Sequence, residues 1–213
     1  MTPMTDSAYW NEFYRTSMAR RLDAPSQFAV FVLSEAEELE TVVDIGCGSG
    51  RDSLFFMSQG KRTISVDASQ SAIDLCSTLA DQHNLNGAGF VCSSVDDSDL
   101  PARLTSLVAD GPAVIYARFF VHAINDAQED AFLDLAAGVM GQGGMLAVEF
   151  RTPRDASQAK VTPDHYRRFA SPLEFMAKAQ ARGLTCTYFV EGFGYAKFRN
   201  DDAHVARCLF RKA

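Results

Sequence analysis

The chain has no long apolar run, no paired cysteines and no excess of basic residues. No hydrophobic segment approaches the length that crosses a bilayer, and the first residues lack the basic and apolar regions of a signal peptide. The 20 Lys and Arg residues are outnumbered by 27 Asp and Glu, which gives a net charge of −7. This balance disfavours a general nucleic-acid binder and an anionic membrane surface as partner. We therefore expect a cytoplasmic protein without nucleic-acid or membrane partners.

The five cysteines are scattered along the chain and never form a Cys-x-x-Cys pair. Such an odd, dispersed set indicates neither a disulfide framework nor a zinc site. Buried thiols in a reducing compartment are the simplest interpretation, because free cysteine usually behaves as a small core residue. Nothing else in the sequence requires a metal ion, and we expect none.

The remaining composition is that of one folded domain. The 213 residues are 47% hydrophobic and 22% charged, which suffices to bury a full core. We expect a single domain over residues 1–213, with a helical lid or cap at 1–40 and a ligand-binding core at 41–150. Residues 151–213 then form an insert and the closing strands.

Strand and helix signals alternate along the core. The expected strands are 41–45, 63–66, 90–92, 113–116, 145–150, 185–190 and 204–210. Helix starts are expected with Pro25 at a first helical position, Ser69 as an N-cap, and capping boxes at Asp126/Glu129 and Ser171/Glu174. Such alternation predicts an α/β fold with a doubly wound, mostly parallel sheet. The last two strands have no helix between them, so they should be antiparallel.

The segment 41–50, TVVDIGCGSG, is the most informative stretch. A short β-branched strand leads into three glycines, Gly46, Gly48 and Gly50, which let the backbone turn and approach a ligand with no Cβ in the way. Asp44 adds an acceptor two residues before the first glycine. Asp67 ends the next strand, 21 residues after Gly46, where an acidic residue accepts hydrogen bonds from a ribose. This pattern predicts a nucleotide-type pocket at the carboxyl ends of the strands.

The glycine spacing distinguishes between nucleotides. A dinucleotide fingerprint, G-x-G-x-x-G/A, needs a small residue at position 51 for close helix–strand packing, and Arg51 stands there. An NAD-type oxidoreductase is therefore disfavoured. The observed pattern, D-x-G-x-G-x-G, supplies oxygen acceptors and close backbone approach instead of a phosphate cradle.

This pattern resembles motif I of the class I S-adenosylmethionine-dependent methyltransferases, in their small-molecule branch. The resemblance rests on residues 42–50 (VVDIGCGSG), 65–69 (SVDAS) and 116–122 (YARFFVH), and extends from about residue 9 to the C-terminus. It implies a Rossmann-like, seven-stranded methyltransferase fold with an antiparallel C-terminal strand, S-adenosylmethionine as cofactor, and an activity in class EC 2.1.1.-.

The resemblance also implies site residues. Asp44 and the loop from Gly46 to Gly50 would hold the aminoacyl part of the cofactor, and Asp67 its ribose. Such enzymes often use an aspartate after the third strand at the adenine; Ser94 aligns there, followed by Val95 and Asp96, which can compensate. The implied cofactor-binding set is Asp44, Gly46, Cys47, Gly48, Ser49, Gly50, Asp67, Ala68, Ser94, Val95, Asp96 and Ala117.

Arg118, His122 and Tyr14 are the candidate catalytic residues. Arg118 and His122 follow the fourth strand at i and i+4, so they share a face if a helix begins there. His122 is either a general base for an acceptor hydroxyl or a positioning residue, and Arg118 an anion clamp. The ring cluster 9–14 either folds over the cofactor as a lid, with Tyr14 near the sulfonium or acceptor, or packs on the core.

A local basic cluster stands out in this acidic chain. Glu149 lies inside an apolar strand and needs a partner such as Arg118 or Arg151, because an unpaired buried charge is costly. Arginine suits bidentate binding of carboxylate or phosphate. We expect an anionic acceptor here, with a solvated basic loop as the alternative; the substrate-binding candidates are Glu149, Arg151, His165, Tyr166, Arg167 and Arg168.

The sequence thus predicts methyl transfer from S-adenosylmethionine to a small anionic molecule bearing a carboxylate or phosphate, with oxygen preferred over nitrogen as acceptor. Proximity and orientation would supply most of the acceleration of an in-line transfer. A non-catalytic binding or interaction protein on the same fold is the main alternative, and an NAD-type oxidoreductase the weaker one.

Overall fold

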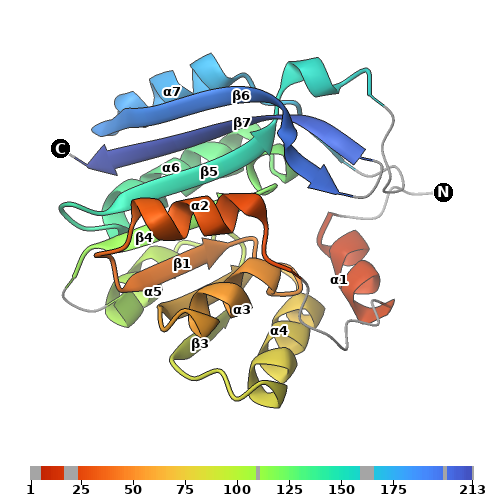
Figure 1. Ribbon diagram of the computed structural model, residues 1–213, viewed down its shortest axis with the longest axis vertical. Coiled ribbons are helices and arrows are strands. Elements are labelled where there is room, and N and C mark those ends of the chain that lie inside the picture. The colour runs from red at the N-terminus through yellow and green to blue at the C-terminus, as the bar shows by residue number, and fades with distance from the viewer. Residues whose placement is uncertain (1–5, 17–23, 109–110, 159–165, 199–200, 213) are drawn as a thin grey trace.

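The computed structural model describes residues 6–16, 24–108, 111–158, 166–198 and 201–212. A seven-stranded sheet in the order β3-β2-β1-β4-β5-β7-β6 forms its centre (Figure 1). The strands are β1 (Thr41–Ile45), β2 (Arg62–Asp67), β3 (Ala88–Cys92), β4 (Ala113–Arg118), β5 (Met145–Arg151), β6 (Leu184–Phe198) and β7 (Asp201–Lys212).

The strand directions confirm the predicted fold class. Strands β1 to β5 pair in parallel, whereas β7 pairs antiparallel with both β5 and β6. The chain order reverses direction across the sheet between β1 and β4, which is the switch point where open α/β sheets bind ligands. Residues of β1 and β5 are buried along their whole length, as expected for strands covered on both faces.

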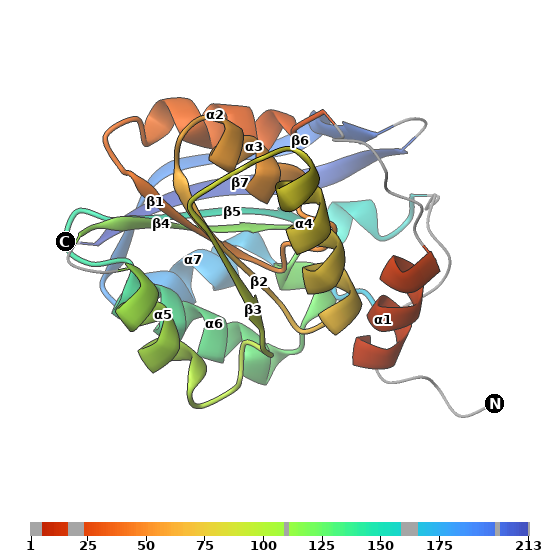
Figure 2. The same cartoon turned by 90° about the horizontal axis from the view of Figure 1, so that it is seen from below.

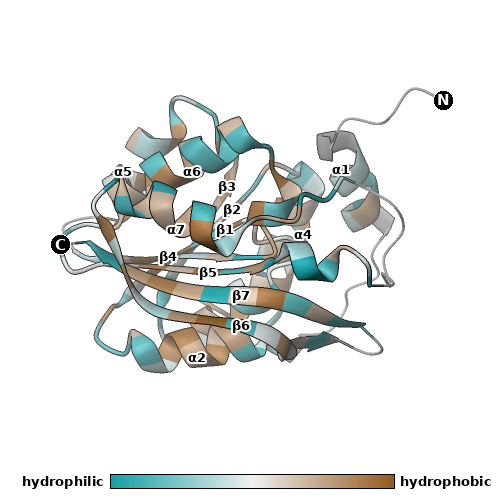
Figure 3. Ribbon diagram, turned by 90° about the horizontal axis from the view of Figure 1, so that it is seen from above, coloured by the Kyte–Doolittle hydropathy of each residue, from teal (hydrophilic) through white to brown (hydrophobic). Residues whose placement is uncertain are grey.

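Helices cover both faces of the sheet (Figure 2). One face carries α2 (Gln27–Glu35), α3 (Arg51–Ser58) and α4 (Gln70–Gln82), and the other carries α5 (Leu100–Val108), α6 (Asp126–Val139) and α7 (Pro172–Gln180). Figure 3 shows hydrophobic residues along the central strands and hydrophilic patches on outer helices such as α6. The largest buried side chains, including Phe28, Phe132 and Phe150, fill the two layers between helices and sheet.

The short helix α1 (Asp6–Thr16) lies apart from these layers, beyond the carboxyl ends of the strands (Figures 1 and 2). It packs against α4, where the side-chain oxygen of Asn11 accepts a hydrogen bond from the Ser69 hydroxyl at 2.8 Å. Helix α1 therefore covers the edge at which the sequence predicts a ligand. None of the helices that the structure describes is both long and apolar enough to cross a membrane.

Two predicted helix starts are wrong by one or two residues. Helix α2 is capped by the Ser26 hydroxyl, which accepts from the Ala29 amide, so Pro25 precedes the cap instead of opening the helix. The capping box of α6 is made by Asn125 and Gln128, one position before the predicted Asp126/Glu129 pair. In both places a better cap stood one residue away, and Glu129 is used in a buried ion pair instead. Ser69 and Ser171 cap α4 and α7 as predicted, but of the predicted Ser171/Glu174 capping box the described hydrogen bonds include only the one from the Glu174 amide to the Ser171 hydroxyl.

Three further differences concern element extents. The sequence patterns above do not predict α5, although Leu100, Leu104 and Val108 form its buried stripe. The closing strands are longer than 185–190 and 204–210, because β6 and β7 continue as a hairpin beyond β5. No α-helix begins at residue 118. Arg118 ends β4, and only a 3₁₀ turn, η1 (Val121–Ala123), contains His122.

Candidate active site

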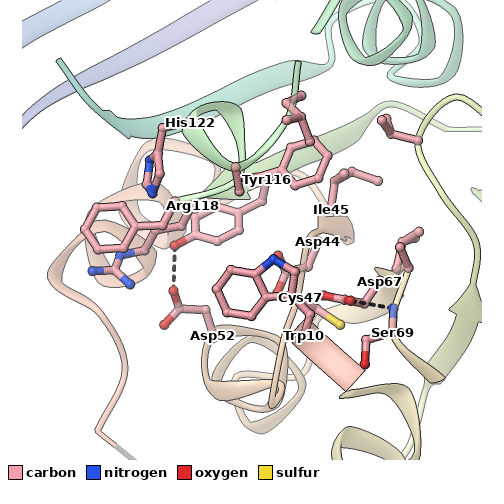
Figure 4. A pocket seen from close by; sticks show the side chains of 18 of the residues that line it. Trp10, Asp44, Ile45, Cys47, Asp52, Asp67, Ser69, Tyr116, Arg118 and His122 are labelled. Carbon is pink, nitrogen blue, oxygen red and sulfur yellow. Dashed lines mark hydrogen bonds between the residues drawn. The ribbon is translucent and has the colours of Figure 1, made fainter. Parts of the chain in front are cut away.

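A cavity of about 600 Å³ lies at the carboxyl ends of β1, β2 and β4 and is also lined by Trp10 and Tyr14 of α1. Figure 4 shows Asp44, Asp67 and Cys47 on one side of it and Arg118 and His122 on the other. The lining from the first three strands and their loops includes Asp44, Ile45, Gly46, Cys47, Ser49, Asp67, Ala68, Ser69, Ser94 and Val95. Following the expectations above, we call the part of the cavity built on β1 to β3 the cofactor end and the part built on β4, β5 and β7 the acceptor end.

The glycine loop has the backbone that the sequence predicts. Gly46, Gly48 and Gly50 have φ angles of 74°, 55° and 82°, a region that L-residues with a Cβ rarely adopt. A Cβ at Gly48 would run into the Tyr14 hydroxyl, and a Cβ at Gly50 into the Cys76 sulfur. Both glycines are therefore required by space as well as by backbone conformation.

The Asp67 carboxylate holds the glycine loop in place through hydrogen bonds. Its Oδ2 accepts a hydrogen bond from the Gly48 amide at 2.9 Å, and its Oδ1 accepts from the Ser69 amide at 2.8 Å. Burial raises the pKa of Asp67, and these two amide donors oppose the shift. The carboxylate therefore joins the end of β2 to the glycine loop and still lines the cavity.

Asp44 is a buried carboxylate at the end of β1. Its Oδ2 accepts a short hydrogen bond of 2.6 Å from the Ser53 hydroxyl on α3. Burial raises its pKa to about 7, while the Ser53 hydroxyl opposes that shift. A cationic group bound beside Asp44 favours its ionised form and lowers this pKa.

The third-strand end of the cavity is polar. Ser94 donates a hydrogen bond to the Asp96 carboxylate, which holds the pKa of Asp96 below its usual range. The Gln128 amide reaches the same carboxylate at 3.4 Å and lines the cavity from α6. Ser94 and Val95 line the cavity, whereas Asp96 stands behind Ser94 and positions it. Gln128 carries no signal in the glycine and strand patterns, because it comes from a distant helix.

Trp10 and Tyr14 of α1 cover the cofactor end. Their rings stack with centroids 5.9 Å apart, and the Tyr14 hydroxyl lies over Gly48. Burial, followed by the nearby Asp67 charge, raises the pKa of Tyr14 well above its ordinary value. Tyr14 is therefore a neutral phenol at physiological pH. The predicted lid and its packing alternative describe the same helix, because α1 both covers the cavity and packs on α4.

A second buried carboxylate, Asp52, was missed by the sequence patterns. Its two oxygens accept from the Ser26 amide, the Ser26 hydroxyl and the Tyr116 hydroxyl, each at 2.8 Å (Figure 4 marks the Tyr116 bond). The signal available was an acidic residue in the first turn of the helix that follows the glycine loop. This network ties the start of α2 to α3 and to the end of β4.

The acceptor end is organised around Glu149, which is fully buried in β5. Its Oε1 accepts from Arg118 Nε and its Oε2 from Arg207 Nε, both at 2.7 Å. Arg207 also donates to the Tyr195 carbonyl at 2.6 Å. Glu149 thus has the arginine partner that its burial requires, and it does not itself line the cavity. Arg118 does line it, and neither of its terminal nitrogens donates to another described residue.

Phe119 sits between two guanidinium groups. The centre of the Arg118 guanidinium lies 4.3 Å from the centroid of the Phe119 ring, and that of Arg151 lies 5.3 Å away. Phe119 has a φ of 57°, an uncommon conformation for a residue with a bulky side chain. Arg151 lines the cavity but is held at 2.5 Å by both Asp155 and Asp201.

His122 is buried and lines the cavity beside these groups. Its Nδ1 accepts a hydrogen bond from the Arg151 backbone amide at 3.3 Å. The Phe119 ring meets the imidazole edge-on, with centroids 5.2 Å apart. His122 and Arg118 therefore reach the cavity together, although not through the helical face that the spacing suggested.

The other predicted residues are placed as follows. Arg167 lines the cavity, whereas Tyr166 and Arg168 do not. The Arg168 guanidinium is paired with Asp126 and Glu129 on α6. Ala117 is buried within β4 and does not line the cavity, and His165 lies outside the described residues. No group of three or more metal-binding side chains occurs in the part of the chain that the structure describes.

A family model matches the part of the chain that contains the glycine loop. Residues 42–144 match the family described as "Methyltransferase domain", from β1 to the residue before β5. The chain carries a class I S-adenosylmethionine-dependent methyltransferase domain. This methyltransferase assignment makes the chain an enzyme of class EC 2.1.1.- and S-adenosylmethionine its methyl donor, as predicted. No curated protein matches the chain by sequence.

Solved structures share the methyltransferase fold over nearly the whole chain. The CcbJ methyltransferase of Streptomyces caelestis aligns over 99% of this chain and 100% of its own, with TM-score 0.73 and 17% identity. An S-adenosylmethionine-dependent methyltransferase of Anabaena variabilis aligns over 97% and 93%, with TM-score 0.72 and 19% identity. The 1,6-didemethyltoxoflavin-N1-methyltransferase of Burkholderia thailandensis aligns over 98% and 84%, with TM-score 0.66 and 17% identity. At these identities the likeness establishes the fold.

Proposed function

We propose that this methyltransferase acts on a small anionic molecule and transfers the methyl group to oxygen. The carrying observation is the Arg118 guanidinium at the cavity wall, whose terminal nitrogens have no partner among the described residues. Such a planar fork binds carboxylate or phosphate with two parallel hydrogen bonds. The cavity volume of about 600 Å³ is in the range of small-molecule sites.

The cofactor end fits the chemistry of S-adenosylmethionine. Asp44, between β1 and the glycine loop, offers a carboxylate for the ammonium of the aminoacyl part, and the loop from Gly46 to Gly50 offers close backbone approach. Asp67 and Ala68 are proposed to contact the ribose. At the adenine, Ser94 and Val95 are proposed as contacts, with Asp96 acting through Ser94 and with Gln128 beside them.

The acceptor contacts are proposed from the other end of the cavity. Arg118 and Arg167 supply positive charge, His122 supplies a polar ring, and Tyr14 reaches in from α1. Arg151 contributes shape more than charge, because Asp155 and Asp201 neutralise it. Arg168, paired with α6, is better suited to hold the segment after β5 than to contact the acceptor. The acidic composition and the scattered free cysteines support a cytoplasmic setting.

Nitrogen is the competing acceptor atom. One structural neighbour is named as an N1-methyltransferase, so the fold accommodates that chemistry. Oxygen is favoured for this chain because a cationic pocket attracts anionic oxygen and repels protonated amines.

The function is tested by methyl transfer from labelled S-adenosylmethionine to matched acceptors. The panel pairs carboxylates and phosphates with neutral alcohols and amines of similar size. We expect transfer to anionic acceptors, and Arg118→Lys should raise their KM at least tenfold while the Kd of S-adenosylmethionine is unchanged. Binding of S-adenosylmethionine without transfer to any acceptor would instead favour a non-catalytic binder.

A further inference from the structure

The environment of His122 fixes which of its nitrogens carries a proton. Nδ1 accepts from the Arg151 amide, so the neutral ring bears its proton on Nε2. The backbone carbonyl of His122 accepts from the Arg168 amide at 2.8 Å, and the side chain is 6% exposed. The ring is therefore held in place, and Nε2 carries the N–H donor of the neutral ring. A general base needs a lone pair at the position where His122 presents N–H.

The other titratable groups of the described cavity are poorly suited to act as a base at the acceptor end. Asp44 and Asp67 belong to the cofactor end and are bound by Ser53 and by two backbone amides. Asp52 accepts three hydrogen bonds, and Asp201 is paired with Arg151. Tyr14 and Tyr116 stay protonated because burial raises their pKa, and contact with Cys76 together with burial raises the pKa of the Cys47 thiol. An acceptor that must lose a proton during transfer finds no base for it among the described residues.

The charge of the acceptor end favours a single negative charge. Arg118 and Arg207 share the one carboxylate of Glu149, which leaves one net positive charge on this triad. Arg151 with Asp155 and Asp201 carries one net negative charge, and Arg167 adds one positive charge at the same end, so these described side chains together carry one positive charge. The free edge of Arg118 presents two donors, which matches the two oxygens of a planar carboxylate.

We propose that the accepting atom is an oxygen of an ionised carboxylate, so that the product is a methyl ester. This inference rests on the proposed function and names its acceptor group. A carboxylic acid with an ordinary pKa of about 4 is already ionised at neutral pH and needs no base. Arg118 binds and orients the carboxylate, and the His122 Nε2–H is a second donor for it.

The step balances without a proton. A carboxylate oxygen lone pair forms the new bond to the methyl carbon while the bond from that carbon to sulfur breaks, and its electron pair stays on sulfur. The positive sulfonium and the negative carboxylate become a neutral sulfide and a neutral ester. Transfer to a hydroxyl, or to an amine that is protonated in solution, would release one proton for each methyl group instead. Proton release therefore distinguishes the acceptor groups.

The experiment uses the full chain, labelled S-adenosylmethionine and a cell-free extract of small metabolites divided into two portions. In one portion the carboxylates are first converted to methylamides with a carbodiimide and methylamine. We expect label transfer only to the untreated portion, release of the label as methanol by mild alkali, and less than 0.1 proton per methyl group transferred (order of magnitude, for a step that consumes an ionised acid).

Each other outcome has a definite meaning. Transfer that survives carboxylate blocking, an alkali-stable product such as an N-methyl or phosphate methyl group, or one proton released per transfer overturns the carboxylate assignment and leaves the proposed methyl transfer intact. No transfer to either portion overturns both proposals.

Two variants of His122 test its role as donor. Glutamine can present an amide N–H near the position of Nε2, whereas alanine cannot. With the acceptor isolated above, His122→Ala should lower kcat/KM roughly 10- to 100-fold, the loss of a hydrogen bond to a charged group, and His122→Gln should restore most of that loss. A kcat loss of about 10²–10⁴-fold in both variants is the result expected of a general base and would falsify the donor role.

Discussion

The two ends of the cavity are built in different ways. At the cofactor end, Asp44, the three glycines and Asp67 lie within 24 residues of sequence and act mainly through backbone conformation and amide donors. At the acceptor end, Arg118, Glu149 and Arg207 come from three strands and act through side-chain charge. The cofactor end is a local motif on a glycine turn, and the acceptor end exists only once the sheet has assembled. The cofactor end therefore indicates the methyl donor, and the acceptor end contains the side chains that distinguish the acceptor of this chain.

The largest expected effect comes from breaking the acceptor end at its centre. Glu149→Gln removes the charge that Arg118 and Arg207 share, leaving two poorly exposed guanidinium groups without a counter-ion. We expect a loss of about 3–5 kcal/mol in the free energy of unfolding, measured by urea denaturation. The matched control is Glu191→Gln, whose partner Arg154 is 71% exposed, with an expected loss of about 0–1 kcal/mol. Equal losses in the two variants would contradict a special role for Glu149.

The next effect concerns the steric limits of the cofactor end. Gly50→Ala and Gly60→Ala both place a Cβ at a φ near 80°, but only at Gly50 does that Cβ meet a neighbour, the Cys76 sulfur. The shared backbone cost is about 1–2 kcal/mol. Overpacking adds about 1–3 kcal/mol at Gly50 alone. Thermal unfolding of the two variants measures the difference, and a Gly60→Ala variant as unstable as Gly50→Ala would speak against a space limit at the loop.

The pH dependence of cofactor binding should follow Asp44. Its folded-state pKa of about 7 lies above its ordinary value, so ionisation opposes folding, and stability in the absence of ligand falls as pH rises from about 4 to 7. Binding of the cationic donor needs ionised Asp44. The Kd of S-adenosylmethionine should therefore fall about tenfold for each unit by which the pH rises toward 7, and stay constant above pH 7. Calorimetry at pH 5.5, 6.5 and 8 measures this, with Asp44→Asn as the comparison. A slope that persists in Asp44→Asn assigns the titration to another group.

The smallest effect tests the Asp52 network between the two ends. Tyr116→Phe removes one of the hydrogen bonds to the buried Asp52 carboxylate, and should cost about 1–2 kcal/mol of unfolding free energy. Tyr188→Phe is the matched control, because the Tyr188 hydroxyl makes no hydrogen bond within the described residues. Denaturant midpoints compare the two. If the tyrosine variants behave alike, Asp52 is held by Ser26 alone.

The same contrast between local motif and long-range contacts explains which parts of the fold and the site could be predicted from the sequence. The positions of the strands along the chain, the glycine loop and the Asp67 acid were predictable, because each depends on a short-range pattern: β-branched runs, a glycine spacing and a strand-end acid. The α6 cap was wrong by one residue, because Asn125 and Asp126 are both good caps and the sequence alone does not rank them. Helix α5 has an apolar stripe that could have been found.

The acceptor end was harder to predict because its partners are far apart. The sequence predicted that Glu149 needs an arginine, but Arg207 lies 58 residues away and gave no local signal. Arg168 looked like an acceptor contact because it stands in a basic cluster, whereas its guanidinium reaches Asp126 and Glu129, about 40 residues upstream. Arginine side chains are long enough to pair in several directions, so composition alone did not fix their use.

The position of Arg207 has a consequence for the order in which the molecule is assembled. Strand β7 follows every other described element in the chain, yet it inserts between β5 and β6 (Figure 1). During synthesis the hydrogen bonds from the glycine loop to Asp67 can form once the first 70 or so residues have emerged. The Glu149 carboxylate can bind its second guanidinium, that of Arg207, only after β7 has paired with β5. The residues of the cofactor end, up to Gln128, are therefore all synthesised before Arg207, which completes the acceptor end.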